Sequence, residues 1–241
     1  MVVDPLTEGY YNISPYAYCK NNPVNRIDPD GMDDYRYDDK TGQFHLMKQT
    51  DDKTDRVLGY HLNKKTGEYK QNTKWHQTKT RMEGIEKGIL SDEVNFKEND
   101  NVISVGGEGK PTVTGVENFV IELSEMVGLE IGGFEYSKKG VTEVSNVYIG
   151  RYQSSKDKPS RWNTDQRAYP SFNPRIAGSM PNEVDFHVDF HTHLSKFPES
   201  DRLRPSGLYT PGGDMEYKRG QQSNGIKKFI ILTRGFPPIE Y

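Results

Sequence analysis

The sequence predicts an α+β fold in which a mixed sheet is flanked by helices, and three observations support this prediction. Residues 114–129 repeat apolar side chains at helical spacing. The segments 130–137 and 183–191 alternate apolar and polar residues as half-buried strands do, and 226–235 contains an apolar run of strand length. The predicted order is therefore helix, two strands, a long polar loop, strand, helix and strand.

Each predicted element has its own pattern. The apolar face of the helix is made of Phe119, Val120, Leu123, Met126 and Val127. The first two strands, 130–137 and 141–152, are joined by a Lys-Lys-Gly turn. Strict alternation in the third strand would place four apolar residues on one side, namely Val184, Phe186, Val188 and Phe190. A short helix is expected to begin at Gly213 or Asp214.

Composition narrows the classes of protein to be considered. The net charge of −3 and the pI near 6.1 do not favour a nucleic-acid partner. The chain has no apolar run of membrane-spanning length, and we expect neither a transmembrane helix nor a Sec-type signal sequence. Cys19 is the single cysteine, which excludes an internal disulfide and a cysteine-rich zinc finger.

Residues 1–32 form the first of three compositional zones and are rich in Tyr, Asn and Pro. The stretch "SPYAYCKNNPVNRIDPDGM" resembles the closing segment of the RHS-repeat-associated core domain of large bacterial proteins, and the resemblance covers about Asp4 to Met32. In that family a variable C-terminal toxin follows the Asp-Pro-x-Gly box, which here contains Asp28 and Asp30. The resemblance implies that residues after this box belong to a toxin.

Residues 33–110 are expected to form a β-rich linker or pretoxin segment. The stretches "YRYDDKTGQFHLMK" and "LGYHLNKKTGEYKQ" each place Lys-Thr-Gly between short alternating runs, a pattern typical of β-hairpins. Tyr35, Tyr37, Phe44 and Leu46 alternate around the first of these turns. The sequence therefore predicts two hairpins ahead of the domain formed by residues 111–241.

The third zone contains a candidate metal site. His191 and His193 are two residues apart at the end of a predicted strand, so both side chains point to the same face and can reach one ion. Asp214 lies at the start of the predicted short helix and can complete a set of three ligands, which is the usual number for a catalytic zinc. Asp201, which lies closer to the histidines in the chain, is the alternative third ligand.

A carboxylate that does not bind the metal is also needed, because hydrolysis requires a base for the attacking water. Glu130 is the candidate, since it enters the first strand after the amphipathic helix. The two glycines of "EIGGF" remove side chains beside it, so a substrate or a backbone segment can approach closely.

Residues 114–238 resemble the JAB/MPN (JAMM) metalloprotease domain, which has a cytidine-deaminase-like fold. That family combines an upstream Glu, a His-x-His at a strand end and a Ser-x-x-Asp at a helix start, which correspond here to Glu130, His191 with His193, and Asp214. Pro211 occupies the position of the family Ser, which supports the oxyanion of the tetrahedral intermediate. Thr210 could supply that hydroxyl, and Ser206 is a second, poorer substitute.

Alternation along the predicted strand also places other polar residues on the face of His191. His187 would share the face of His191 as an additional ligand or, more simply, as a partly buried structural histidine. Asp185 and Asp189 have the same parity, and one of them could hydrogen-bond a ligand histidine.

The resulting functional hypothesis is a Zn²⁺-dependent peptidase or isopeptidase, carried as the toxin of an RHS-type protein. It implies a protein substrate in a target cell, a cognate immunity protein and delivery by a bacterial secretion system. Two alternatives stay open: a metal-dependent nuclease toxin, and a catalytically inactive MPN-like binding module.

Overall fold

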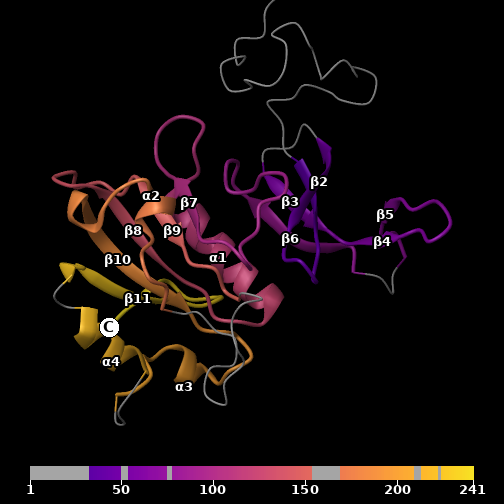
Figure 1. Ribbon diagram of the computed structural model, residues 1–241. Coiled ribbons are helices and arrows are strands. Elements are labelled where there is room, and N and C mark those ends of the chain that lie inside the picture. Colours follow the sequence, from indigo (N-terminus) through magenta and orange to yellow (C-terminus); the bar gives the residue numbers. More distant parts are fainter. Residues whose placement is uncertain (1–32, 50–53, 75–77, 154–168, 209–212, 222–223) are drawn as a thin grey trace, which may run out of the picture.

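The computed structural model describes residues 33–49, 54–74, 78–153, 169–208, 213–221 and 224–241. It has mixed α+β architecture, which confirms the predicted fold class at that level (Figure 1). The RHS-like segment 1–32 and the candidate hydroxyl residue Thr210 both lie outside the described residues.

The first sheet is formed by segments of the expected linker. Its strands are β1 (Asp33–Tyr37), β2 (Phe44–Gln49), β3 (Asp55–Leu58) and β6 (Thr80–Ile85), in the order β2-β1-β3-β6. β1 and β2 form the first predicted hairpin, and β4 (Tyr60–Leu62) pairs with β5 (Tyr69–Gln71) as the second, so both hairpin predictions are confirmed. Tyr35, Tyr37 and Phe44 point into the core, as their alternation predicts.

The second sheet has six strands in the order β12-β11-β10-β8-β9-β7. They are β7 (Asn101–Ser104), β8 (Gly132–Lys138), β9 (Asn146–Ile149), β10 (Val184–Thr192), β11 (Lys228–Leu232) and β12 (Ile239–Glu240). β10 runs parallel to β11 and antiparallel to β8, so the sheet is mixed. The predicted helix, two strands, strand, helix and strand are confirmed in that order, whereas part of the predicted long loop, residues 154–168, lies outside the described residues.

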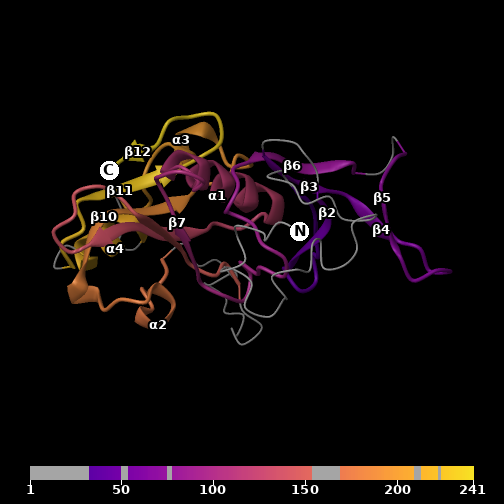
Figure 2. The same ribbon diagram turned by 90° about the horizontal axis from the view of Figure 1, so that it is seen from above.

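Helix α1 (Val113–Val127) lies at the junction of the two sheets (Figures 1 and 2). It begins at Thr112, whose hydroxyl accepts a hydrogen bond from the Gly115 amide, and ends at Gly128 in the left-handed conformation. Phe119, Val120 and Leu123 of the predicted face are fully buried, whereas Met126 and Val127 are partly buried. The amphipathic pattern therefore predicted the helix and most of its buried face.

The largest apolar core is continuous across α1 and both sheets. Phe119 of α1 packs against Phe96 and Phe44, with ring centroids 5.1 and 6.4 Å apart. Strand β7, which lies within the segment expected to be a linker, pairs with β9 and forms an edge of the six-stranded sheet. Residues 33–110 thus contribute both to this core and to the second sheet.

The apolar residues of β10 were predicted to share one face of the strand, and a β-bulge makes this prediction wrong. The register against β8 shifts between Phe186 and Val188, so the side chains before and after the shift alternate out of phase. Val184 and Phe186 pack with Tyr136 on one face, whereas Phe190 packs into the α1 core on the other. The four apolar residues therefore do not share one side of the strand.

The remaining helices are short. They are α2 (Pro174–Ala177), the 3₁₀ turn η3 (Pro181–Glu183), α3 (Glu199–Arg202) and α4 (Gly213–Gln221), and the last is the short helix that the sequence predicts. Within the described parts of the chain, no helix combines the length and the apolar character needed to cross a bilayer.

Candidate metal centre

The two histidines are held at the end of β10 by pairing with both neighbouring strands. His191 lies opposite Gly132 of β8 and Ile231 of β11, and the His193 amide donates to the Leu232 carbonyl at 2.9 Å. Because the alternation continues regularly past the bulge, both imidazoles face the same side of the sheet. Regular strand geometry therefore positions this pair without help from a loop.

Asp214, the second residue of α4, completes a cluster with the histidines. His191 Nε2 lies 3.1 Å from His193 Nε2 and 3.2 Å from Asp214 Oδ1, and His193 Nε2 lies 3.6 Å from Asp214 Oδ2. The three residues are only 1%, 9% and 2% exposed. This buried group is able to hold a metal ion.

The separations within the cluster are close to those around a small tetrahedral ion. Bonds of about 2.0–2.1 Å separate neighbouring ligand atoms by roughly 3.3–3.4 Å. The two Nε2 atoms and Asp214 Oδ1 give separations of 3.1 and 3.2 Å from His191 Nε2, and the second carboxylate oxygen, Oδ2, lies 3.6 Å from His193 Nε2.

The hydrogen bond on the far side of the His193 ring favours metal binding. His193 Nδ1 lies 3.2 Å from the carbonyl oxygen of Arg202, which can only accept, so Nδ1 carries the hydrogen. In the neutral ring this arrangement leaves the Nε2 lone pair directed at Asp214 and His191. Metal-bound histidines are commonly oriented by a bond of this kind.

The electrostatics of the cluster are dominated by its carboxylate. Burial alone would raise the pKa of Asp214, but hydrogen bonds to His191 and His193 hold that pKa far below its ordinary range. Burial alone would lower the pKa of His193, but the Asp214 hydrogen bond and the charge of Glu130 outweigh it and raise the pKa. The negative charge of Asp214 thus favours a cation in the cluster.

Two residues that the sequence did not identify as supports orient the Asp214 carboxylate. The Tyr169 hydroxyl donates to Oδ1, and the Ser206 amide donates to Oδ2. The Asp214 amide in turn donates to Ser206 Oγ at 3.0 Å. Gly213, with φ of 70°, allows this approach, because a Cβ there would lie 2.2 Å from Ser206 Oγ.

Glu130 lies beside the cluster, between the end of α1 and the start of β8. It precedes Gly132, the partner of His191, by two residues, so regular alternation directs its side chain to the histidine face. Burial raises the pKa of Glu130, while the nearby charges of His193 and His191 lower it in part. The structure therefore brings together four of the predicted site residues: Glu130, His191, His193 and Asp214.

The alternative third ligand is not part of the cluster. Asp201 lies on α3 with an exposed side chain that accepts a hydrogen bond from Ser200 Oγ. Among the residues described, the ligand group contains Asp214 and not Asp201. Ser206, considered from the sequence as a substitute hydroxyl, bonds Asp214 through its backbone amide, and its Oγ accepts from the Asp214 amide.

The bulge in β10 also separates the other polar residues of the strand. His187 does not join the site face; its Nε2 lies 2.7 Å from Ser137 Oγ and its Nδ1 lies 3.1 Å from Lys227 Nζ. Asp185 accepts from the Gly140 amide instead of a ligand histidine. The shared parity expected for these residues and His191 is therefore wrong, because one extra residue reverses the alternation.

Asp189 remains on the site face but binds a tyrosine. Its Oδ2 accepts from the Tyr217 hydroxyl at 2.8 Å, and burial raises its pKa to about 7. Tyr217 stacks on Tyr169, with centroids 4.4 Å apart, and Tyr169 contacts the His191 ring. An aromatic wall therefore shields the His191 side of the cluster.

The space left by the missing side chain of Gly133 is occupied by the chain itself. A Cβ on Gly133 would lie 2.1 Å from the Tyr148 carbonyl oxygen and 2.4 Å from Phe190 Cζ. The close approach expected at "EIGGF" is thus made at Gly133 by a neighbouring strand and an aromatic ring of the same chain.

No protein-family model, no curated protein and no solved structure matches this chain.

Proposed function

We propose that this protein is a zinc-dependent peptidase or isopeptidase of the JAB/MPN type. The observation that carries the proposal is the buried cluster of His191, His193 and Asp214 with the Glu130 carboxyl group beside it. Two imidazoles, one carboxylate and a separate acid are the groups that metal-assisted hydrolysis of an amide needs.

Zinc is the proposed ion because two neutral imidazole nitrogens and one carboxylate oxygen are ligands that it favours. His191, His193 and Asp214 would hold it, and their separations fit its bond lengths. When bound, a zinc ion polarises the scissile carbonyl and lowers the pKa of a coordinated water to about 7.

The residues around the ion supply the proton transfers. Glu130 accepts a proton from the attacking water and delivers it to the departing amine. Its burial supports this role, because a raised pKa brings a carboxyl group closer to the pH at which it must both take up and release a proton. Tyr169 and Ser206 keep the Asp214 carboxylate in place, and Thr210 is the proposed donor to the oxyanion.

The proposed biological setting rests on the RHS-like segment 1–32. We infer that the protein is the toxin end of an RHS-type polymorphic toxin, delivered into a neighbouring cell by a bacterial secretion system. There it would cleave a protein substrate, and the producing cell would need a cognate immunity protein.

The experiment that tests the proposal uses Glu130→Gln, which keeps the shape of the side chain and removes its basicity. We expect one equivalent of zinc by elemental analysis in both proteins. Cleavage of peptides from a bacterial lysate should be about 10²–10⁴-fold slower in the variant. Glu143→Gln is the matched control, because Glu143 is an exposed glutamate on the turn before β9.

Toxicity on expression in a bacterium should follow the same pattern, with Glu143→Gln toxic and Glu130→Gln harmless. Full toxicity of Glu130→Gln would refute the assignment of the base. Degradation of nucleic acid by the wild-type protein, without cleavage of any peptide, would replace the peptidase by the metal-dependent nuclease.

A further inference from the structure

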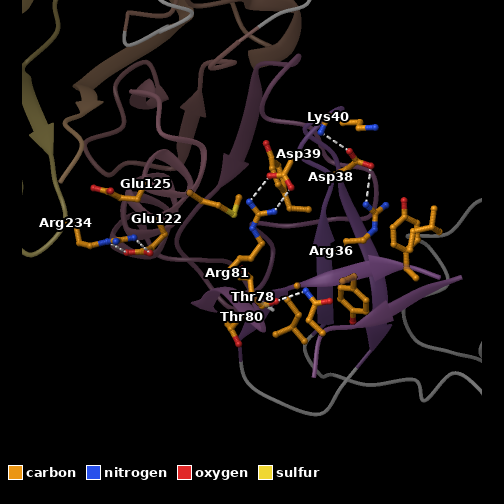
Figure 3. Close-up of a pocket in the computed structure, with 18 residues that line it drawn as sticks. Arg36, Asp38, Asp39, Lys40, Thr78, Thr80, Arg81, Glu122, Glu125 and Arg234 are labelled. Atoms are coloured by element: carbon orange, nitrogen blue, oxygen red, sulfur yellow. Dashed lines mark hydrogen bonds and ion pairs between the residues drawn. The ribbon is translucent and has the colours of Figure 1, made fainter. Parts of the chain in front are cut away.

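A cleft of about 860 Å³ lies between the first sheet and the C-terminal half of α1 (Figure 3). One wall comes from β1, the turn that follows it and the β4–β5 hairpin. The opposite wall comes from Glu122, Glu125 and Met126 of α1, together with Arg234. The mechanism described above uses none of these residues.

Most charged side chains that line the cleft neutralise one another. Arg36 pairs with Asp38, Arg81 forms two hydrogen bonds to Asp39, and Arg234 forms two to Glu122. Such pairs leave little net charge to offer a ligand.

Glu125 and Lys40 are the exceptions. In the described part of the chain, neither side chain is within ion-pair distance of an opposite charge, and Figure 3 shows them at opposite ends of the cleft. Glu125 accepts hydrogen bonds only from neutral groups, the Ser195 amide at 2.6 Å and Ser195 Oγ at 2.8 Å. These bonds fix the carboxylate but leave its charge uncompensated and some of its lone pairs free.

The same bonds connect the cleft to the metal centre. Ser195 follows His193 by two residues, and Lys196 Nζ reaches back to the Gly128 carbonyl at the end of α1. Glu130 lies just beyond that helix end. A ligand seated on Glu125 would therefore lie against the segment that follows His193 and beside the end of the helix that precedes Glu130.

The remaining surface of the cleft suits an aliphatic chain. Met126 lies next to Glu125 on α1, and a thioether adapts to varied apolar partners. Further along, Leu62 and Tyr69 are 48% and 41% exposed, and the Arg36 guanidinium stacks on the Tyr69 ring at 3.9 Å. Met126 beside the Glu125 carboxylate matches the stem and head of a basic side chain.

We propose that this cleft is a substrate subsite that binds a lysine or arginine side chain of an extended protein segment, with its cationic head on Glu125. The inference rests on the proposed peptidase function, for which it names a specificity determinant. The rest of the segment would run along the cleft towards Leu62 and Tyr69.

Binding is measured in the full chain carrying Glu130→Gln, so that the probe is not consumed. The probes are two fluorescein-labelled decapeptides, identical except for a central lysine in one and norleucine in the other. At low ionic strength we expect the lysine peptide to bind about threefold to fivefold more tightly, as for a partly exposed ion pair. That preference should disappear in Glu125→Gln.

Glu143→Gln is the control, because it changes the net charge equally at an exposed site outside the cleft and should keep the preference. Thr80→Trp places a large side chain in the cleft and should weaken both peptides without a charge change. Equal binding of the two peptides by the parent protein, no binding of either, or a preference that persists in Glu125→Gln would each overturn the inference.

A cleavage experiment separates this inference from the proposed function. Wild-type protein with zinc is incubated with bacterial peptides generated by cleavage at glutamate, which retain internal lysines and arginines. We expect basic residues to be enriched at one fixed distance from the cut and the enrichment to vanish in Glu125→Gln. Cleavage without any basic preference would refute the subsite alone, whereas no cleavage at all would refute the peptidase and leave the binding experiment to decide the cleft.

Discussion

Ser206 and Asp214 are joined by two reciprocal hydrogen bonds that involve the backbone amide of each residue. Ser206 Oγ accepts from the Asp214 amide at 3.0 Å, while the Ser206 amide donates to the Asp214 carboxylate. The first bond satisfies an amide at the start of α4, and the second orients the side chain of a candidate metal ligand. Formation of the helix and alignment of the ligand are thereby coupled.

We predict that Ser206→Ala destabilises the protein by about 1 kcal/mol and weakens zinc binding up to tenfold. The amide of Asp214 loses its acceptor, while the bond from the Ser206 amide remains. Urea unfolding and competition with a chromophoric zinc chelator measure the two effects. Ser200→Ala is the control, because that hydroxyl donates to the exposed Asp201, and an equal effect of both variants would contradict the coupling.

Tyr169→Phe should weaken zinc binding by roughly tenfold with little loss of stability. The phenyl ring can keep its stacking on Tyr217, but the donor to Asp214 Oδ1 is removed. Tyr217→Phe is the matched control, since its hydroxyl donates to Asp189 and not to a ligand. If the two variants had the same zinc affinity, Tyr169 would be only a packing residue.

The identity of the third ligand is tested by replacing aspartate with asparagine at each of the two candidate positions. Asp214→Asn should abolish stoichiometric zinc binding, whereas Asp201→Asn should leave about one equivalent bound. A chelator should also lower the melting temperature of the wild type and of Asp201→Asn, because bound metal stabilises the folded state by about 2.7 kcal/mol at one hundred times its Kd. Retention of zinc by Asp214→Asn would remove the basis of the proposed centre.

Two neighbouring acidic residues, Glu117 of α1 and the buried Glu135 of β8, make stability depend on pH. Burial, and then the neighbouring charge of Glu117, raise the pKa of Glu135 to about 8 from an ordinary value of 4.5. Between these values the folded protein retains a proton that the unfolded chain has lost, so stability falls as the pH rises from about 4.5 to about 8.

Glu135→Gln removes this titration, since an amide is neutral in both states. The variant should gain on the order of 2–4 kcal/mol over the wild type at pH 8, and the gain should shrink towards pH 5. Thermal unfolding across this range measures it, with Glu143→Gln as the exposed control. A pH-independent difference between Glu135→Gln and the wild type would indicate that the carboxyl is already ionised in the folded state.

Regular periodicity is the part of the fold that the sequence predicted well. The helical face around Phe119 follows a simple repeat, and the alternation after the bulge in β10 places His191 and His193 on one face. Asp214 could be suggested because a helix start following a glycine-rich turn is visible in the sequence. The three residues of the candidate metal cluster could therefore be predicted from the sequence.

The irregular strand geometry and the contacts between residues distant in sequence could not be predicted in this way. Nothing in the alternating sequence around His187 indicates a bulge. The prediction that residues on both sides of it share one face of the strand was therefore wrong. Tyr169 and Ser206 contact Asp214 from 45 and 8 residues away, and neither position carries a pattern that points to a metal ligand. Such contacts follow from how the chain returns to the site, which periodicity does not encode.

The unbroken apolar core beneath α1 restricts how this chain can be shortened. A truncated protein starting at residue 111 would lose strand β7 and uncover Phe119 where Phe44 and Phe96 now pack. We expect such a fragment to aggregate when expressed, whereas one starting at Asp33 should remain soluble and unfold in a single transition. Attempts to shorten the chain for crystallisation, or to fuse it to another protein, must therefore retain the first sheet.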